Sequence, residues 1–209
     1  MTNMNSKNSI LRRWGITESE FTELVSQNPS LRGILLGYVA EKKFHDAFLN
    51  SPQITEASKD DDHDRKRKGD RRFVYKGGSF IIEVKSLQSN LVENFGVDRW
   101  RGKSQVDASD SRTVTFANGS KLKTTCLRRG EFDILAVNCF AFGEQWRFAF
   151  ALNSELPPNT YRKYTKYQRQ QLLPTLITLE WPLQPPFTDD LFALLDRLVK
   201  TRKSPATHR

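Results

Sequence analysis

The segment that most constrains the fold is residues 70–86, "DRRFVYKGGSFIIEVKS". Two runs rich in aromatic and β-branched residues flank Gly77 and Gly78, and this pattern predicts a β-hairpin with the two glycines in its turn. Side chains alternate along a strand, so Glu83 and Lys85 share one face of the second strand and its apolar residues share the other. The charged pair belongs either to a solvated face or to a functional site.

Asp70 opens this hairpin on the preceding strand. If the two strands pair, Asp70 and Glu83 converge at the end away from the turn. Two carboxylates suit a hard divalent cation such as Mg²⁺, which prefers oxygen ligands and keeps several waters. A metal-bound water can attack a phosphodiester in line, and Lys85 can position that water or stabilise charge on the phosphate. These residues favour a metal-dependent phosphodiesterase, although a Glu-x-Lys pair by itself is common on solvated strands.

Two helices are predicted ahead of the hairpin. Thr17 and Glu20 have capping-box spacing, which predicts a short helix from this point. A longer helix follows, from about residue 30 to Leu49, and it places Glu41 on the same side as apolar residues. This acid either lies at the rim of the helix, paired with a neighbouring lysine, or supports the site.

The rest of the chain predicts a polar loop, further strands and a last helix. The elements expected in chain order are a loop over residues 51–70, a hairpin around Asn118-Gly119, two apolar strands around a turn near Gly143, a strand in 175–181 and a helix opened by residues 188–190. This order indicates an α/β (α+β) fold with a mixed sheet. We expect one domain over residues 1–209. Its parts are an N-terminal helical extension (1–29), a catalytic core (30–155) and a C-terminal strand-helix extension (156–209).

The formal net charge of +9 is compatible with simple solubility and also with a polyanionic partner such as nucleic acid. Basic side chains near a cleft hold phosphates. The Tyr- and Arg-rich segment 161–169 either lies along a groove or packs on the body of the protein. The candidate DNA contacts are Arg65, Lys66, Arg67, Lys68, Arg99, Arg101, Lys103, Gln105, Ser109 and Arg112. Among them Gln105 is more typical of a turn or surface position than of a functional contact.

The arrangement of these motifs resembles the PD-(D/E)XK nuclease superfamily, and within it the restriction-endonuclease-like proteins. The resemblance lies in Asp70 before a glycine-turned hairpin, an apolar run and then Glu83-Val84-Lys85, with Glu41 on a preceding helix. It covers roughly residues 31–137. It implies a mixed central β-sheet flanked by helices, metal ligation by Asp70 and Glu83, an auxiliary metal or water role for Glu41 and the catalytic lysine role for Lys85. The sequence departs from the pattern at Gly69, where many members have proline.

The resemblance also implies an activity and its partners. We expect a Mg²⁺-dependent endonuclease of restriction type that cleaves double-stranded DNA, in which Mn²⁺ can replace Mg²⁺. A homodimer and a companion DNA methyltransferase are expected with it. Two alternatives stay open, a catalytically silent nucleic-acid-binding module of the same fold and a nuclease directed at RNA or repair intermediates.

Other features exclude or leave open further classes. No apolar run reaches the length of a membrane span, and the N-terminus has no signal-peptide core, so we expect a cytoplasmic protein without membrane partners. Cys126 and Cys139 form no zinc-binding pattern with the three histidines. Asp133 interrupts an apolar strand, where it contacts Lys85, Arg129 or the metal site, or faces solvent.

Overall fold

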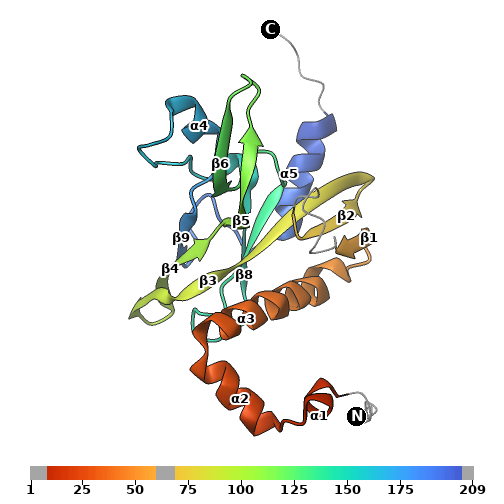
Figure 1. Ribbon diagram of the computed structural model, residues 1–209. Coiled ribbons are helices and arrows are strands. Elements are labelled where there is room, and N and C mark those ends of the chain that lie inside the picture. The colour runs from red at the N-terminus through yellow and green to blue at the C-terminus, as the bar shows by residue number, and fades with distance from the viewer. Residues whose placement is uncertain (1–8, 60–68, 204–209) are drawn as a thin grey trace. The chain divides into compact units, whose positions relative to one another are not determined.

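A computed structural model describes residues 9–59 and 69–203 of the chain (Figure 1). The predicted DNA contacts Arg65, Lys66, Arg67 and Lys68 lie outside these ranges. The chain divides into two compact units, Met1–Val39 and Ala40–Arg209, each described here by itself. The division falls within helix α3, so the predicted boundary between residues 29 and 30 stays a prediction.

The elements follow one another in the order helices, strands and a final helix. The helices are α1 (Ile10–Trp14), α2 (Glu18–Gln27), α3 (Pro29–Phe44), the π-helix η2 (His45–Leu49), the 3₁₀-helix η3 (Asn153–Glu155), α4 (Lys166–Gln171) and α5 (Leu191–Lys203). The strands are β1 (Ile54–Lys59), β2 (Arg71–Tyr75), β3 (Gly78–Gly96), β4 (Arg99–Gln105), β5 (Asp107–Thr115), β6 (Lys121–Cys126), β7 (Ile134–Asn138), β8 (Phe148–Leu152) and β9 (Leu176–Trp181). None of the helices described is long and apolar enough to cross a membrane.

In the first unit, the predicted capping box begins α2. The Thr17 hydroxyl accepts a hydrogen bond from the Glu20 backbone N–H at 3.1 Å, and the Glu20 carboxylate accepts one from the Thr17 N–H at 2.7 Å. Neither α1 nor α2 has a buried residue. Large apolar side chains are therefore exposed here, among them Trp14 at 62% and Ile34 at 60%. The apolar residues that share a side of α3 with Glu41 are thus exposed at Ile34 and Tyr38.

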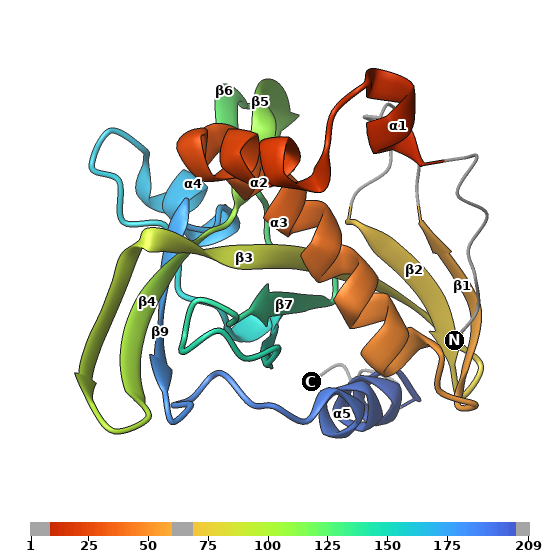
Figure 2. The ribbon, with the colours of Figure 1, turned by 90° about the horizontal axis from the view of Figure 1, so that it is seen from below.

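The second unit is built on a mixed sheet, as the sequence predicts. Its strands run in the order β1-β2-β3-β4-β9, with β7 and β8 joined to β3. The long β3 pairs antiparallel with β2 in its first part, parallel with β7 in its middle and antiparallel with β4 in its second part. Figure 2 shows β3 crossing the unit and turning into β4. This α+β arrangement, with helices against a mixed sheet, confirms the predicted fold class.

Apolar side chains fill both sides of the central strands. On one side, residues of β3 and β8 such as Phe80 and Phe150 pack with Phe44 of α3 and Leu195 of α5. On the other side, Leu135 of β7 packs with residues from β4, β9 and the connecting loops. All residues of β7 and β8 are buried, which is the pattern of strands covered on both faces.

Two local predictions are corrected. The β2–β3 turn is formed by Lys76 and Gly77, both with positive φ, whereas Gly78 already pairs with Tyr75 in the sheet. Part of the predicted polar loop is the edge strand β1, in which Ile54 is buried and the other side chains are exposed. A single buried residue gives no alternating pattern, so β1 is fixed by pairing with β2 rather than by its own sequence.

Candidate active site

The predicted site lies where β3 changes partners from β2 to β7. Ile82 faces Arg71 of β2 on one side and Ile134 of β7 on the other. Just before β2, the Asp70 N–H donates to the Ile82 carbonyl at 2.9 Å. The Asp70 Oδ2 accepts a hydrogen bond from the Val84 N–H at 2.7 Å. These two bonds fix the Asp70 carboxylate against the backbone of β3 beside Glu83, as the hairpin predicts.

Gly69 is required by this geometry. Its φ is +83°, a conformation that proline cannot adopt because its ring fixes φ near −65°. A Cβ at this position would lie 2.2 Å from Cγ2 of Ile81. The positive φ of Gly69 and its closeness to Ile81 therefore explain why this position holds glycine and not proline.

Glu83 and Lys85 form an ion pair, with 2.7 Å between Lys85 Nζ and Glu83 Oε1. Their side chains are only 8% and 24% exposed, respectively. They point to the side of the sheet that holds Leu135 and Val137, because Glu83 and Lys85 pair with these residues of β7. The solvated-face alternative is thus wrong for this pair. A carboxylate packed into a protein interior also calls for a partner of opposite charge.

The environment raises the proton affinity of both groups. Burial, and next the charge of Asp70, raise the pKa of Glu83 to about 7 from an ordinary 4.5. Burial would lower the pKa of Lys85, but the charges of Glu83 and Asp70 outweigh it and raise that pKa. Lys85 is therefore a cation at neutral pH. A divalent cation beside the two carboxylates would relieve the repulsion that raises the pKa of Glu83.

Glu41 lies at the edge of the same site. Its Oε2 is 3.1 Å from Nζ of Lys59 and 3.3 Å from a guanidinium nitrogen of Arg71, and its side chain is 15% exposed. Burial, and then the charge of Asp70, raise the pKa of Glu41. The structure thus brings Glu41 into the electrostatic field of Asp70, with two basic partners of its own. Its role toward a metal stays a prediction.

Asp133 and Arg112 have structural partners. Asp133 accepts a hydrogen bond from the Ile81 N–H at 2.8 Å and is ion-paired with Arg202 of α5, so it links β3 to that helix. The Arg112 guanidinium pairs with Glu131 and is 19% exposed, which turns it away from a phosphate on the surface.

The other predicted DNA contacts that the structure describes lie around β4 and β5. Arg101 is ion-paired with Glu180 at 2.7 Å. Gln105 donates to Asp107 at 3.0 Å and accepts from Gln88 at 3.4 Å, the surface role expected of it. Arg99, Lys103 and Ser109 are exposed.

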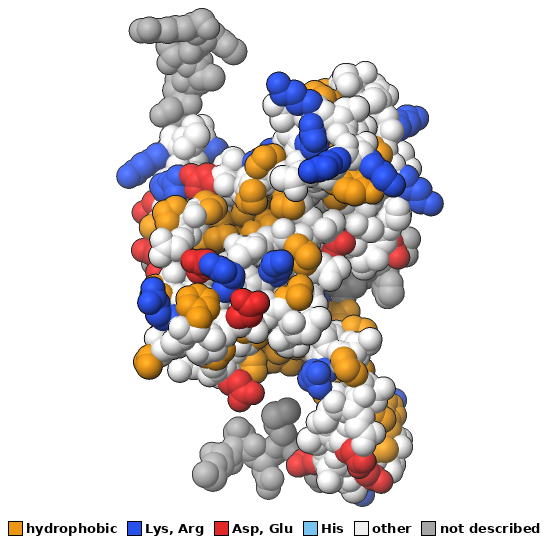
Figure 3. All heavy atoms as spheres, turned by 90° about the vertical axis from the view of Figure 1, so that its left-hand side faces the viewer, with side chains coloured by type: hydrophobic (Ala, Val, Ile, Leu, Met, Phe, Trp, Pro, Cys, Tyr) orange, Lys and Arg blue, Asp and Glu red, His pale blue; other side chains and the backbone are white. Residues whose placement is uncertain are grey.

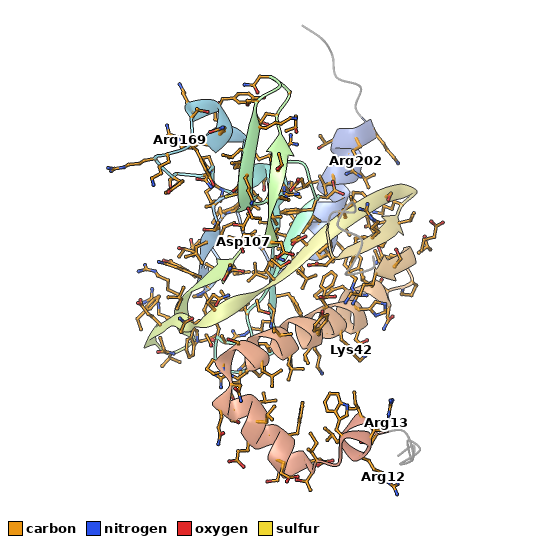
Figure 4. The ribbon with its side chains drawn as sticks, viewed as in Figure 1. Arg12, Arg13, Lys42, Asp107, Arg169 and Arg202 are labelled. Carbon is orange, nitrogen blue, oxygen red and sulfur yellow. The ribbon has the colours of Figure 1, made fainter. Side chains whose placement is uncertain are left out.

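Two acids near the site were not predicted. The charge of Asp107 acts on Lys85, and that of Glu131 acts on Glu83. Asp107 lies at the start of β5, beside β3, as Figure 4 shows. Neither acid stands in the hairpin motif, and the only sequence signal was that Asp107 closely follows Gln105.

The side-chain oxygens at the site determine which metal ion could bind there. Within residues 9–59 and 69–203, no three His, Cys, Asp or Glu side chains form a metal-binding cluster. Asp70 and Glu83 are nonetheless two oxygen donors brought together, and Mg²⁺ binds proteins through one or two carboxylates while keeping several waters. The residues present therefore suit a hydrated Mg²⁺ ion rather than a fully protein-enclosed metal.

Comparisons with known proteins yield one weak structural likeness. No protein-family model matches the sequence, and no curated protein matches it significantly. The chain is similar in structure to a bacterial homing endonuclease, I-Ssp6803I, with 14% sequence identity and a TM-score of 0.43. The alignment covers 81% of this chain and 97% of the other. Similarity at this level assigns no residue of the site.

Proposed function

We propose that the protein is a Mg²⁺-dependent endonuclease that cleaves double-stranded DNA. The observation that carries the proposal is the meeting of Asp70, Glu83 and Lys85 at one point of β3, where burial and then the charge of Asp70 raise the pKa of Glu83. Charged groups with strongly perturbed pKa values cluster at functional sites. Placing a second carboxylate, Asp70, beside the Glu83–Lys85 pair adds negative charge that raises the pKa of Glu83, and a bound cation would offset that charge.

The residues have distinct roles in this proposal. Asp70 and Glu83 hold the cation, which when bound supplies an activated water and offsets charge on the phosphate. Lys85 is protonated at neutral pH, so it acts as a hydrogen-bond donor and positive charge toward the phosphate or the attacking water rather than as a base. Glu41 supports the site through Asp70, in contact with Lys59 and Arg71.

The test is cleavage of unmethylated duplex DNA by the purified protein, with Mg²⁺, with Mn²⁺ and with EDTA. We expect discrete fragments in both metals, none in EDTA, and loss of cleavage in Lys85→Ala. A matched control is Lys200→Ala, an exposed lysine of α5 that has no part in the proposed site. A smear would remove the restriction role but keep the nuclease. A gel shift without any cleavage would favour a silent binding module, and preferential cleavage of RNA or branched DNA would favour a repair or RNA-directed enzyme.

Restriction of foreign DNA is the proposed biological role, with a companion DNA methyltransferase protecting host sites. Cleavage of both strands is then expected from a homodimer. The exposed apolar side chains of the first unit, including Trp14, Leu24 and Ile34, support association of two copies there. The charges in this unit are complementary, since α1 carries Arg12 and Arg13 (Figure 4) and α2 carries three glutamates.

A further inference from the structure

Two segments of the second unit contain many basic residues and no acidic ones. They are residues 111–130 and 156–179, which together hold nine lysines and arginines. The basic residues are Arg112, Lys121, Lys123, Arg128, Arg129, Arg162, Lys163, Lys166 and Arg169. The whole chain has 33 basic and 24 acidic residues, so an acid-free stretch of this extent concentrates positive charge in one region.

The fold brings the two segments together. The Tyr164 hydroxyl lies 2.9 Å from the Thr124 hydroxyl of β6. The ring of Tyr167 meets Phe116 with 5.9 Å between centroids, and Leu172 is buried in the same cluster. The tyrosines of segment 161–169 thus pack against the β5–β6 ribbon, which decides between the two alternatives for Tyr164 and Tyr167. Packing on one side leaves basic residues of the segment exposed, among them Lys163 and Lys166.

The β5–β6 ribbon is a separate two-stranded sheet with one covered face and one exposed face. Val114 and Leu122 pair on the covered face. On the exposed face Thr113 pairs with Lys123 and Thr115 with Lys121, so it displays lysines and hydroxyl groups. Lysines bind phosphates, and hydroxyls bind phosphates or base edges. A two-stranded ribbon of this kind has the width to enter the major groove, about 12 Å across.

The β5–β6 ribbon begins near the active site, and exposed basic side chains lie on the same part of the protein. Figure 3 shows Lys and Arg side chains gathered in the upper part of the face that carries α4. The base of the ribbon begins at Asp107, whose charge acts on Lys85. Arg112 of β5 forms an ion pair with Glu131, and the charge of Glu131 acts on Glu83. A polyanion lying along the ribbon would therefore pass beside the catalytic residues.

We propose that residues 111–126 of the β5–β6 ribbon and segment 159–172, together called the ribbon module, form the surface that binds duplex DNA and presents it to the active site. This inference rests on the proposed nuclease function for its biological meaning. It differs from the sequence prediction in the residues that hold DNA, because Arg112 points inward and Arg101 is paired with an acid. The contacts instead come from the lysines of β6 and of segment 161–169.

The test is binding of a mixed-sequence duplex by fluorescence anisotropy in EDTA, over a series of salt concentrations. We expect Lys121→Ala/Lys123→Ala to weaken binding and to reduce the slope of log affinity against log salt by about 1.8, because each lost phosphate contact removes about 0.9. The matched control is Lys200→Ala/Lys203→Ala, which removes the same charge from exposed positions of α5. It should leave the slope nearly unchanged.

A second pair separates the two parts of the module. Lys163→Ala/Lys166→Ala should give a similar loss of slope, and combining it with the ribbon pair should give roughly the sum. Thermal melting checks that each variant is folded. Equal loss in the α5 control and in the ribbon variants would overturn the proposal, because the effect would then come from net charge alone. Tighter binding to single-stranded RNA than to duplex DNA would also overturn it.

Binding and cleavage distinguish this inference from the nuclease proposal. Cleavage by the wild type with unchanged binding in the ribbon variants would refute the ribbon module and keep the nuclease. Binding that is lost in the ribbon variants, together with no cleavage in any metal, would support the module and refute the nuclease. Wild-type protein that neither binds nor cleaves duplex DNA would refute both.

Discussion

The buried Glu83 carboxylate makes stability depend on pH in a way that identifies the site. In the folded protein the pKa of Glu83 is about 7, above its ordinary value of 4.5. A raised carboxyl pKa means that the native state binds the proton more tightly than the unfolded state. The contribution of Glu83 to the free energy of unfolding therefore falls as pH rises from about 4.5 to about 7 and levels off above that.

The magnitude follows from the same two values. The difference between them corresponds to at most about 3 kcal/mol, because one pKa unit is about 1.4 kcal/mol and the carboxylates titrate together with Lys85. Glu83→Gln cannot ionise and has nearly the same shape. In EDTA, the free energy of unfolding of Glu83→Gln should rise relative to that of the wild type as pH increases from about 5 to about 8. The expected gain is up to about 3 kcal/mol.

Mg²⁺ should remove most of this difference in stability between the two proteins. A cation present at about 100 times its Kd adds about 2.7 kcal/mol of stability to a protein that binds it, or roughly 5–10 °C in Tm for a chain of this size. The wild type should gain this stabilisation above about pH 7, where Glu83 is ionised, and Glu83→Gln should lose most of it.

The assay is urea unfolding followed by tryptophan fluorescence, in EDTA and in Mg²⁺, at several pH values. Glu180→Gln is the matched control, since this glutamate of β9 is paired with Arg101 but 40% exposed. Identical pH dependence of the wild type and Glu83→Gln in EDTA would refute the burial of Glu83 beside Asp70. Equal Mg²⁺ stabilisation of both would refute Glu83 as a metal ligand.

Three further outcomes are expected from the packing. Gly69→Ala places a Cβ 2.2 Å from Ile81 at positive φ, so we expect a loss of at least about 1–2 kcal/mol by thermal melting and weaker cleavage as Asp70 shifts. Phe150→Ala, at a position with no exposed surface, should cost about 3–5 kcal/mol in urea unfolding, and a loss below 1 kcal/mol would contradict the core described. Leu24→Ser/Ile34→Ser should shift a dimer toward monomer in light scattering without lowering Tm, whereas an unchanged mass would place the interface elsewhere.

The sequence predicts local features well because their causes are local. The capping box at Thr17, the turn at Gly119 and the convergence of Asp70 with Glu83 each depend on residues close together in the chain. The edge strand β1 was missed because it depends on pairing with β2 and has one buried side chain.

The surroundings of the site could not be predicted for the same reason. Alternation in β3 separates Glu83 and Lys85 from its apolar residues, but it cannot show that β4, β9 and the connecting loops bury the second face as well. Asp107 acts on Lys85 because β4 runs back antiparallel along β3, so that Ser104 pairs with Leu87 just before Asp107. Contacts between elements that are far apart in the chain produce no characteristic residue spacing in the sequence, so sequence patterns cannot predict them.

The cost of burying Glu83 is itself an argument for the proposed site. A buried ion pair is often no more stabilising than apolar residues of similar volume, and a second carboxylate nearby makes it less so. The residues of β3 next to Glu83 are apolar, with Phe80 and Ile82 fully buried and Val84 buried as well. A sequence selected for stability alone would continue that pattern through position 83. Binding of a cation and a phosphate would account for this cost. Burial raises the pKa of Glu83, and the same burial strengthens the attraction of its carboxylate for a divalent ion.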